Sequence, residues 1–152
     1  MLGHPPLLED ALTKGVRRVL IISPWITGKV VDPDFLSKLE GLLRKEAEVY
    51  IGYGMTEQPT AKPDSRDLAA KERLTALSRR YPKFRFKRLG NTHAKVLIKD
   101  SEFAVITSSN WLSFKGDPNR PYRDEQGVLI QGVENVDRKF DELIDRFDPE
   151  EQ

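Results

Sequence analysis

Cysteine is absent from this chain of 152 residues. Its absence excludes disulfide bonds and metal sites built from thiolates, and it agrees with a reducing, cytoplasmic location. Histidine is scarce as well, since only His4 and His93 occur. A site that needs two imidazoles therefore has few sources for them within one chain.

Long apolar runs and an excess of charge of one sign are also missing. No stretch approaches the ~20 apolar residues that cross a membrane, and the start of the sequence lacks the basic and apolar regions of a signal peptide. The 25 basic and 24 acidic residues leave a net charge of +1. The sequence thus predicts no membrane partner, and recognition of phosphate groups has to come from a local patch.

What is present is the composition of one globular domain. Hydrophobic residues make up 38% and charged residues 32% of the chain, which is ordinary for such a domain. A chain of this length can bury a sizeable core. We interpret residues 1–152 as a single domain, which is either complete or a piece of a longer protein.

The hydrophobic pattern predicts both helices and strands. Helices are expected over residues 7–15, about 32–46, 66–80 and 134–147, and strands over residues 17–23, 48–53, 84–89, 94–99, 103–107 and 126–131. Asp32 or Asp34 is expected to cap the second helix, and the strands 94–99 and 103–107 are expected to form a hairpin. Helices and strands alternate in the first part of the chain, and strands predominate in the second part. The expected fold class is α/β, with a mixed β-sheet flanked by helices on both faces.

One run of the sequence places several chemically capable side chains on adjacent apolar segments. His93 and Lys95 lie two residues apart in THAKVLIKD, so they share one face of the expected strand. Asp100 ends this run, and Ser108 and Asn110 follow in ITSSNW. An imidazole and an ammonium group at the edge of a hydrophobic core can bind a phosphate and attack it.

The spacing H-x-K-x4-D-x6-T-S-x-N resembles the HKD motif of the phospholipase D superfamily, in which Gly stands at the position of Thr107. Weaker similarity to strands of this superfamily extends over VLIISPWIT and RDEQGVLI. The resemblance implies a phospholipase D-like fold and a phosphodiesterase activity. The chain contains one motif, and in this it is similar to the single-motif bacterial endonucleases, which work as homodimers.

These residue types suit attack on an anionic phosphodiester without a metal or another cofactor. Phosphate does not repel a neutral imidazole, so His93 is the expected nucleophile and forms a covalent phosphohistidine. Lys95, Ser108 and Asn110 are expected to bind the nonbridging oxygens and to stabilise charge in the transition state. In the superfamily the His of a second motif protonates the leaving oxygen. Here a second copy, related by a two-fold axis through the site, is expected to supply it.

Acidic residues are expected to support this site. In the superfamily a Glu in a run resembling E-x-G-V orients the nucleophilic imidazole, and Glu125 in EQGV fits this pattern better than its neighbour Asp124. Asp100 is expected to be structural, as a hydrogen-bond anchor for the turn after the motif strand. The sequence therefore predicts one positioning carboxylate and one anchoring carboxylate.

A local basic run, RRYPKFRFKR, precedes the motif. Such a run is commonly a solvated face, but next to this motif it is also suited to following a nucleic-acid backbone. A tryptophan that follows the motif is suited either to stacking on a base or to packing in the core. The candidate nucleic-acid contacts are Arg85, Lys87, Arg88, Lys115 and Trp111.

Three functions agree with these features. The leading hypothesis is a metal-independent nuclease that cleaves DNA, in preference to RNA, as a homodimer. The second is a nucleic-acid-binding or dimerisation module of a larger DNA-processing or restriction-type protein, a possibility raised by Thr107 in place of Gly. The third is a phospholipase or phosphatidyltransferase, whose relatives generally carry two motifs in one chain and often an apolar anchor.

Overall fold

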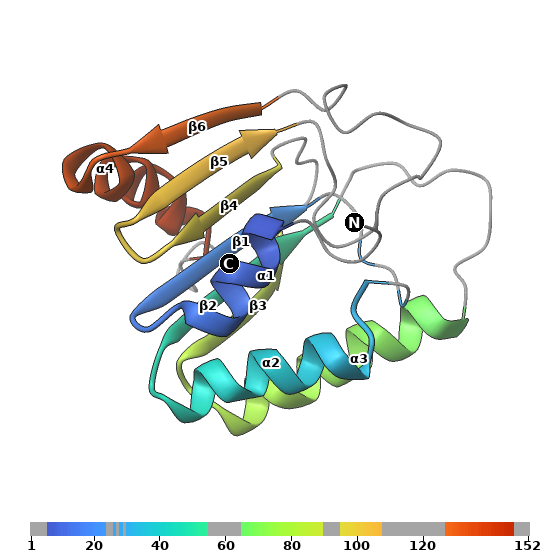
Figure 1. The fold of residues 1–152 in the computed structure, drawn as a ribbon. Coiled ribbons are helices and arrows are strands. Elements are labelled where there is room, and N and C mark those ends of the chain that lie inside the picture. Colours follow the sequence, from blue (N-terminus) through green and yellow to red (C-terminus); the bar gives the residue numbers. More distant parts are fainter. Residues whose placement is uncertain are drawn as a thin grey trace.

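Figure 1 shows the computed structural model of the chain, which describes residues 6–23, 26, 28, 30–54, 65–89, 95–107 and 127–147. The helices are α1 (Pro6–Lys14), α2 (Pro33–Arg44), α3 (Ser65–Arg80), α4 (Val133–Ile144) and the short 3-10 helix η2 (Asp145–Phe147). The strands are β1 (Arg18–Ser23), β2 (Glu48–Tyr53), β3 (Phe84–Arg88), β4 (Val96–Lys99), β5 (Phe103–Thr107) and β6 (Gly127–Gln131). None of the helices in these ranges combines the length and the apolar character needed to cross a membrane.

The strands form one mixed sheet in the order β3-β2-β1-β4-β5-β6. β1, β2 and β3 are parallel, and α2 and α3 make the crossovers between them, as parallel neighbours require. β4 lies antiparallel to β1, and β4, β5 and β6 continue as an antiparallel meander. This arrangement, with helices on both faces of the sheet (Figure 1), confirms the α/β fold class.

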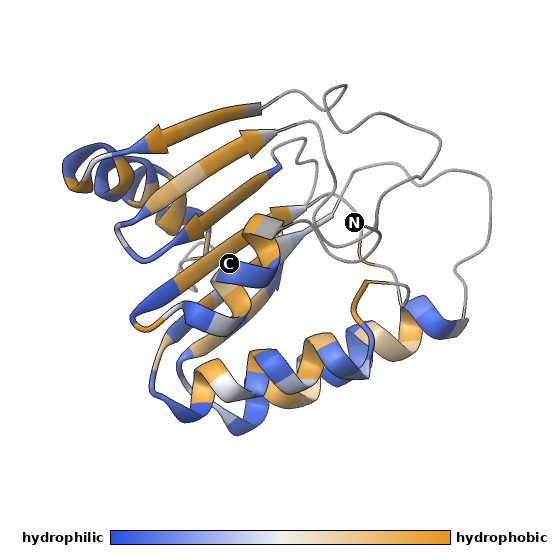
Figure 2. Ribbon diagram, in the orientation of Figure 1, coloured by the Kyte–Doolittle hydropathy of each residue, from blue (hydrophilic) through white to orange (hydrophobic). Residues whose placement is uncertain are grey.

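Two apolar layers hold the helices to the sheet. Consecutive residues of a strand point to opposite faces, so Val19 and Ile21 of β1 pack under α1, α2 and α3, whereas Leu20 and Ile22 pack with α4 and η2. Because both faces of this central strand are covered, its sequence is apolar without alternation. Figure 2 shows the same contrast, with apolar strands and helices that are apolar along one side.

Local signals explain where the elements begin and turn. The side chain of Asp32 accepts a hydrogen bond from the backbone N–H of Phe35 at 2.9 Å, and Pro33 is the first residue of α2. Of the two candidate caps, Asp32 is therefore the one used. The expected hairpin forms between β4 and β5, and Asp100 in its turn has a φ of 50°. Asp is among the few non-glycine residues that tolerate this left-handed conformation.

The expected element boundaries hold to within about two residues. β4 begins at Val96 rather than at residue 94, and α2 ends at Arg44 rather than near residue 46. The helix expected over 134–147 is divided into α4 and η2. Most of the expected loop 54–66 and all of the expected loop 113–124 lie outside the described residues.

Candidate active site

The segments of the motif meet at the end of the sheet where β4 begins. β4 starts at Val96, directly after Lys95, and Val96 lies opposite Ile106 of β5. β5 runs the other way and ends at Thr107, which lies opposite Gly127, the first residue of β6. The chain therefore enters β4, leaves β5 and enters β6 at one end of the sheet, which we call the motif end.

Lys95 is the motif residue that the structure describes at this end. It is half-buried, and it makes no hydrogen bond or ion pair with another described residue. The remaining candidates for this site and for nucleic-acid contact in this region lie outside the described residues; they are His93, Ser108, Asn110, Glu125 with its rival Asp124, Trp111 and Lys115.

Side chains that the sequence pattern did not single out also lie at the motif end. The carboxyl ends of the parallel strands β1, β2 and β3 bring Ser23, Tyr53 and Arg88 there. Tyr53 stacks on Phe86 with 5.0 Å between ring centroids, and Lys71 of α3 lies 5.2 Å from the Tyr53 centroid. Burial raises the pKa of Tyr53, against the opposing charge of Arg88. The rule that parallel strands place their carboxyl ends at one edge is the signal that finds these residues.

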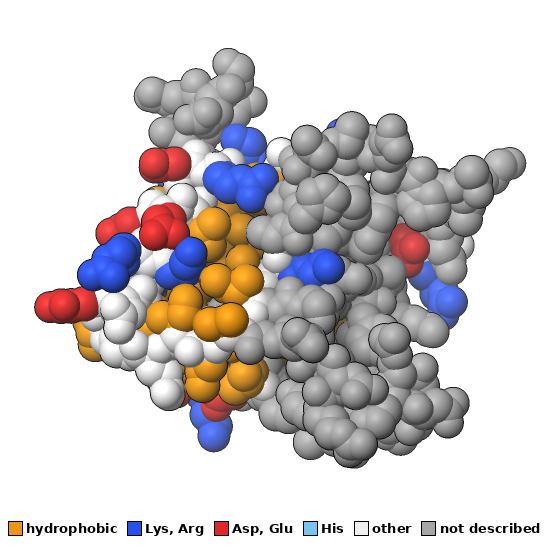
Figure 3. Space-filling model, turned by 90° about the horizontal axis from the view of Figure 1, so that it is seen from above, with side chains coloured by type: hydrophobic (Ala, Val, Ile, Leu, Met, Phe, Trp, Pro, Cys, Tyr) orange, Lys and Arg blue, Asp and Glu red, His pale blue; other side chains and the backbone are white. Residues whose placement is uncertain are grey.

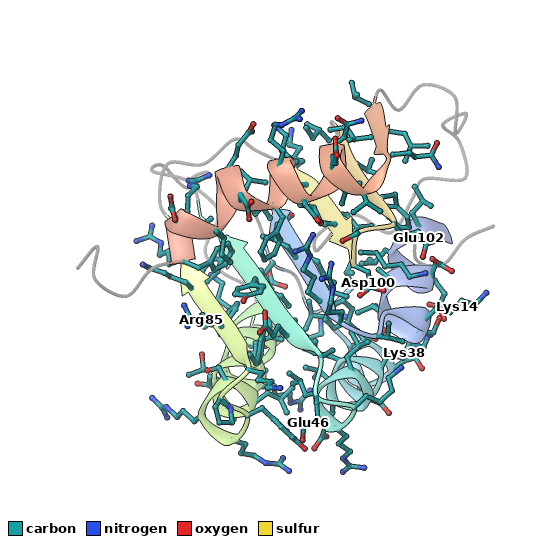
Figure 4. All side chains as sticks on the ribbon, turned by 90° about the vertical axis from the view of Figure 1, so that its left-hand side faces the viewer. Lys14, Lys38, Glu46, Arg85, Asp100 and Glu102 are labelled. Carbon is teal, nitrogen blue, oxygen red and sulfur yellow. The ribbon has the colours of Figure 1, made fainter. Side chains whose placement is uncertain are left out.

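Asp100 lies at the opposite end of the sheet, which we call the far end (Figure 4). Its carboxylate accepts hydrogen bonds from the backbone N–H groups of Arg17 at 2.7 Å and Arg18 at 2.9 Å, and from that of Val16 at 3.3 Å. The Asp100 backbone N–H also donates to the carbonyl of Arg18. Asp100 thus ties the β4–β5 turn to the connection between α1 and β1, which is what a structural anchor does.

Two clusters of ion pairs lie at the far end. The Lys99 ammonium is buried and binds Asp10 at 2.7 Å and Glu102 at 2.9 Å. Burial alone lowers the pKa of Lys99, but the hydrogen bonds to Asp10 and Glu102 raise that pKa overall. Asp137 of α4 accepts hydrogen bonds from Ser101 at 2.6 Å and from Arg18.

The basic residues of β3 are spread along the other side of the sheet. Arg85 and Arg88 are exposed, whereas Lys87 is half-buried. Arg88 ends the strand at the motif end, while Arg85 lies opposite Tyr50, nearer the far end. Because β2 and β1 separate β3 from β4, these side chains start about 14 Å across the sheet from the motif strand.

Comparisons with known proteins identify the fold. No protein-family model and no curated protein matches this sequence. Among solved structures, Nuc from Salmonella typhimurium, a phospholipase D family member, matches with a TM-score of 0.61 and 15% identity over 92% of this chain and 84% of that one. NucT from Helicobacter pylori matches with a TM-score of 0.58 and 15% identity over 92% and 86% of the two chains.

An archaeal chromatin protein, TrmBL2, is a third structural neighbour. Its structure is described as showing a novel mode of DNA binding, and it matches with a TM-score of 0.56 and 16% identity. The match covers 92% of this chain but 47% of the chromatin protein, so this chain spans about half of that protein's length. The chain thus has the fold of the phospholipase D superfamily, as the motif predicted, in a size close to that of Nuc and NucT.

Proposed function

We propose that this protein is a phosphodiesterase that cleaves DNA without a metal ion, through a site shared by two copies of the chain. The observation that carries the proposal is the meeting of three chain segments at the motif end, beside a lysine that no described carboxylate neutralises. A positive, half-buried group at such a place attracts an anionic substrate.

Covalent connectivity supports the assignment of the site residues. A residue extends the chain by at most about 3.6 Å. His93 precedes Lys95 by two residues, Asn110 follows Thr107 by three, and Glu125 precedes Gly127 by two. We propose that these residues act on one phosphate group, because each is close in sequence to the described end of one of three neighbouring strands.

The proposed reaction has two displacements at phosphorus. In the first, the imidazole of His93 attacks phosphorus, a P–N bond forms, and the P–O bond to the leaving oxygen breaks while His93 of the second copy gives that oxygen a proton. In the second, water attacks the phosphohistidine, gives its proton to His93 of the second copy, and the P–N bond breaks. Both imidazoles end as they began, so no external acid, base or cofactor is consumed.

The other motif residues stabilise charge or hold the nucleophile. Lys95 binds a nonbridging oxygen as a cation, and the Asn110 amide and Ser108 hydroxyl donate hydrogen bonds to the oxygens of the crowded transition state. Glu125 accepts the second N–H of the His93 imidazole and so fixes its orientation. Asp100 does not contact the substrate, since it anchors the far end.

Nucleic acid is the substrate class that the basic residues favour. Arg88 ends β3 at the motif end, and Arg85 and Lys87 form a positive strip on the opposite face of this strand. A strip about 14 Å from the motif strand corresponds to phosphates a few nucleotides from the cleaved bond. Lys115 and Trp111 would add a phosphate contact and a stacking surface.

The decisive experiment compares the wild-type chain with His93→Ala on labelled single- and double-stranded DNA in excess EDTA. We expect cleavage by the wild type to persist under chelation. The variant should be slower by about 10⁴-fold or more, because it loses both the nucleophile and the general acid of the shared site. Cleavage that needs added metal, or that His93→Ala retains, would contradict the proposal.

A DNA-binding protein without cleavage is the second candidate. Thr107 adds a side chain where the motif has Gly, and one structural neighbour is a chromatin protein whose structure is described by its DNA binding. Binding that weakens with salt, together with uncut DNA under all conditions, would favour this candidate. Restoration of cleavage by Thr107→Gly would show that the threonine is what suppresses it.

A further inference from the structure

A row of paired residues crosses the sheet at the motif end. Arg88 of β3 lies opposite Tyr53 of β2, and Tyr53 lies opposite Ser23 of β1. The antiparallel pairing of β1 with β4 ends at Val96, so Lys95, the residue before it, continues the row beside Ser23. The row therefore links the lysine of the motif to residues of the parallel strands.

Tyr53 and Lys95 lie on the same face of the sheet, the one that α2 and α3 cover. Tyr53 packs against the core layer on that face. Leu97 belongs to this layer and Val96 to the opposite one, and because strand residues alternate, Lys95 shares the face of Leu97. Two strand spacings, or about 10 Å, separate β2 from the motif strand.

Lys71 of α3 brings a second lysine over this row. It is half-buried, and its ammonium group lies 5.2 Å from the centroid of the Tyr53 ring. Phe86 stacks on the same ring with 5.0 Å between centroids. Among the described residues no carboxylate forms an ion pair with Lys71. A cation that is held against an aromatic ring keeps its charge and its N–H donors for an external anion.

The Tyr53 hydroxyl provides a hydrogen-bond donor at the same place. Tyr53 is half-buried, and its hydroxyl makes no hydrogen bond with another described residue. Burial raises the pKa of Tyr53, and the nearby charge of Arg88 opposes this rise, so the hydroxyl is protonated at neutral pH. Because Phe86 and Lys71 already contact the ring, the hydroxyl rather than the ring is the group that a ligand meets.

The described surface on the side of β6 is different. Figure 3 views the molecule from that side, and hydrophobic side chains gather there, with Asp and Glu side chains beside those of Lys and Arg. The sequence of β6, GVLIQ, contains no basic residue. The described cations therefore attract a polyanion along the row from β4 toward β2 and β3.

We propose that Lys71 and Tyr53 bind a second phosphate of the substrate, next to the phosphodiester that is cleaved. Lys71 supplies a positive charge and the Tyr53 hydroxyl supplies a hydrogen bond. The inference rests on the proposed function and deepens it, because two sites on strands about 10 Å apart select a strand with successive phosphates. The substrate class is thus a polynucleotide rather than a molecule with a single phosphodiester, such as a phospholipid.

Salt-dependent binding tests this contact without cleavage. The full chain with His93→Ala is titrated with labelled single-stranded DNA in EDTA, alone and with Lys71→Met, Lys71→Arg or Lys83→Met added. Loss of one phosphate contact lowers the slope of log K against log salt by about 0.7 on single strands. We expect this loss for Lys71→Met alone, because arginine keeps the cation and Lys83 pairs with Glu46 at the far end. An unchanged slope for Lys71→Met would overturn the proposal.

Cleavage rates test the selectivity for successive phosphates. We expect Lys71→Met to cleave DNA about 10- to 100-fold more slowly and Tyr53→Phe, which keeps the ring, about 3- to 10-fold more slowly, since hydrogen bonds to charged groups are the stronger ones. Both variants should hydrolyse bis(p-nitrophenyl) phosphate, which has one phosphate, at the wild-type rate. Equal losses on the two substrates would overturn the proposal, and full activity of Tyr53→Phe on DNA would overturn the role of its hydroxyl.

These measurements separate the second phosphate site from the nuclease activity. A wild-type chain that cleaves neither substrate in EDTA, together with a lowered slope for Lys71→Met, would support the second site and contradict the proposed function. Cleavage of both substrates by the wild type, together with an unchanged slope for Lys71→Met, would overturn the second site and leave the nuclease activity in place.

Discussion

Lys95 and Lys99 lie at opposite ends of the same short strand segment and have opposite surroundings. Lys99 is buried between Asp10 and Glu102, and both carboxylates bind its ammonium group. Lys95 is half-buried and has no ionic or hydrogen-bonding partner among the described residues. A cation that is neutralised by its own protein stabilises the fold, whereas one without such a partner remains able to bind an external anion. The comparison divides the molecule into a structural far end and a motif end.

Replacement of Lys95 tests the motif end and has the largest expected effect. We expect Lys95→Met to lower DNA cleavage by about 10²–10³-fold, because the transition state loses one positive group at a nonbridging oxygen. The urea midpoint of unfolding should change little, since no described partner is lost. A variant that cleaves DNA at the wild-type rate would show that Lys95 does not bind the substrate.

Replacement of Asp100 tests the far end. Asp100→Ala removes an acceptor of three backbone N–H groups and places alanine at a positive φ. We expect a loss of about 3 kcal/mol in the free energy of unfolding, measured in urea. Asp100→Asn is the control, because asparagine keeps an acceptor oxygen and tolerates this φ, and its loss should be about half as large. Equal losses for the two variants would contradict the anchor role.

Lys99→Met replaces a lysine of the far end with methionine, as Lys95→Met does at the motif end. It leaves Asp10 without its closest cation, although Asp10 keeps some solvent contact. We expect a destabilisation of about 1–2 kcal/mol, with unchanged DNA cleavage by the folded fraction. If Lys99→Met lowered the turnover of fully folded protein, the division between the two ends would be wrong.

The pH dependence of stability gives the smallest expected effect. The hydrogen bond from Ser101, together with the Arg18 guanidinium, lowers the pKa of Asp137 from 3.8, against the opposing effect of burial. A lowered folded pKa means that this stabilisation is present above the unfolded pKa and is lost as pH falls through the folded pKa. Between about pH 5 and pH 3, thermal unfolding of Asp137→Asn should therefore depend less on pH than that of the wild type. Parallel curves for the two proteins would show that Asp137 is not the group involved.

Much of the fold was predictable because the local hydrophobic patterns agree with the faces that the tertiary structure buries. The apolar runs of β1 and β2, a cap of α2 at Asp32 or Asp34 and the β4–β5 hairpin all follow from short stretches of sequence, and the structure selects Asp32. The phospholipase D-like fold was predictable from the motif spacing alone, and the solved structures confirm it. The roles of His93, Ser108, Asn110 and Glu125 stay predictions, since these residues lie outside the described ranges.

Other features depend on residues that are far apart in the sequence. The partners of the Asp100 carboxylate lie 82 to 84 positions away along the chain, and Asp137 reaches Arg18 over 119 positions. The sequence predicted that Asp100 anchors its own turn, and the structure adds that it binds the α1–β1 connection. Tyr53, Lys71 and Ser23 escaped notice at the motif end because nothing in their immediate neighbours marks them as parts of a site.

The amino-acid sequence by itself determined the chemistry available to this protein. Its motif places one imidazole, one ammonium and one amide at a fixed spacing, and the chain contains no thiol. Only the tertiary structure decided that Lys99 is neutralised while Lys95 has no described partner, and that β3 and β6 form the two edges of the described sheet. Burial, pairing and strand order arise from contacts between distant segments, and short sequence patterns do not contain them.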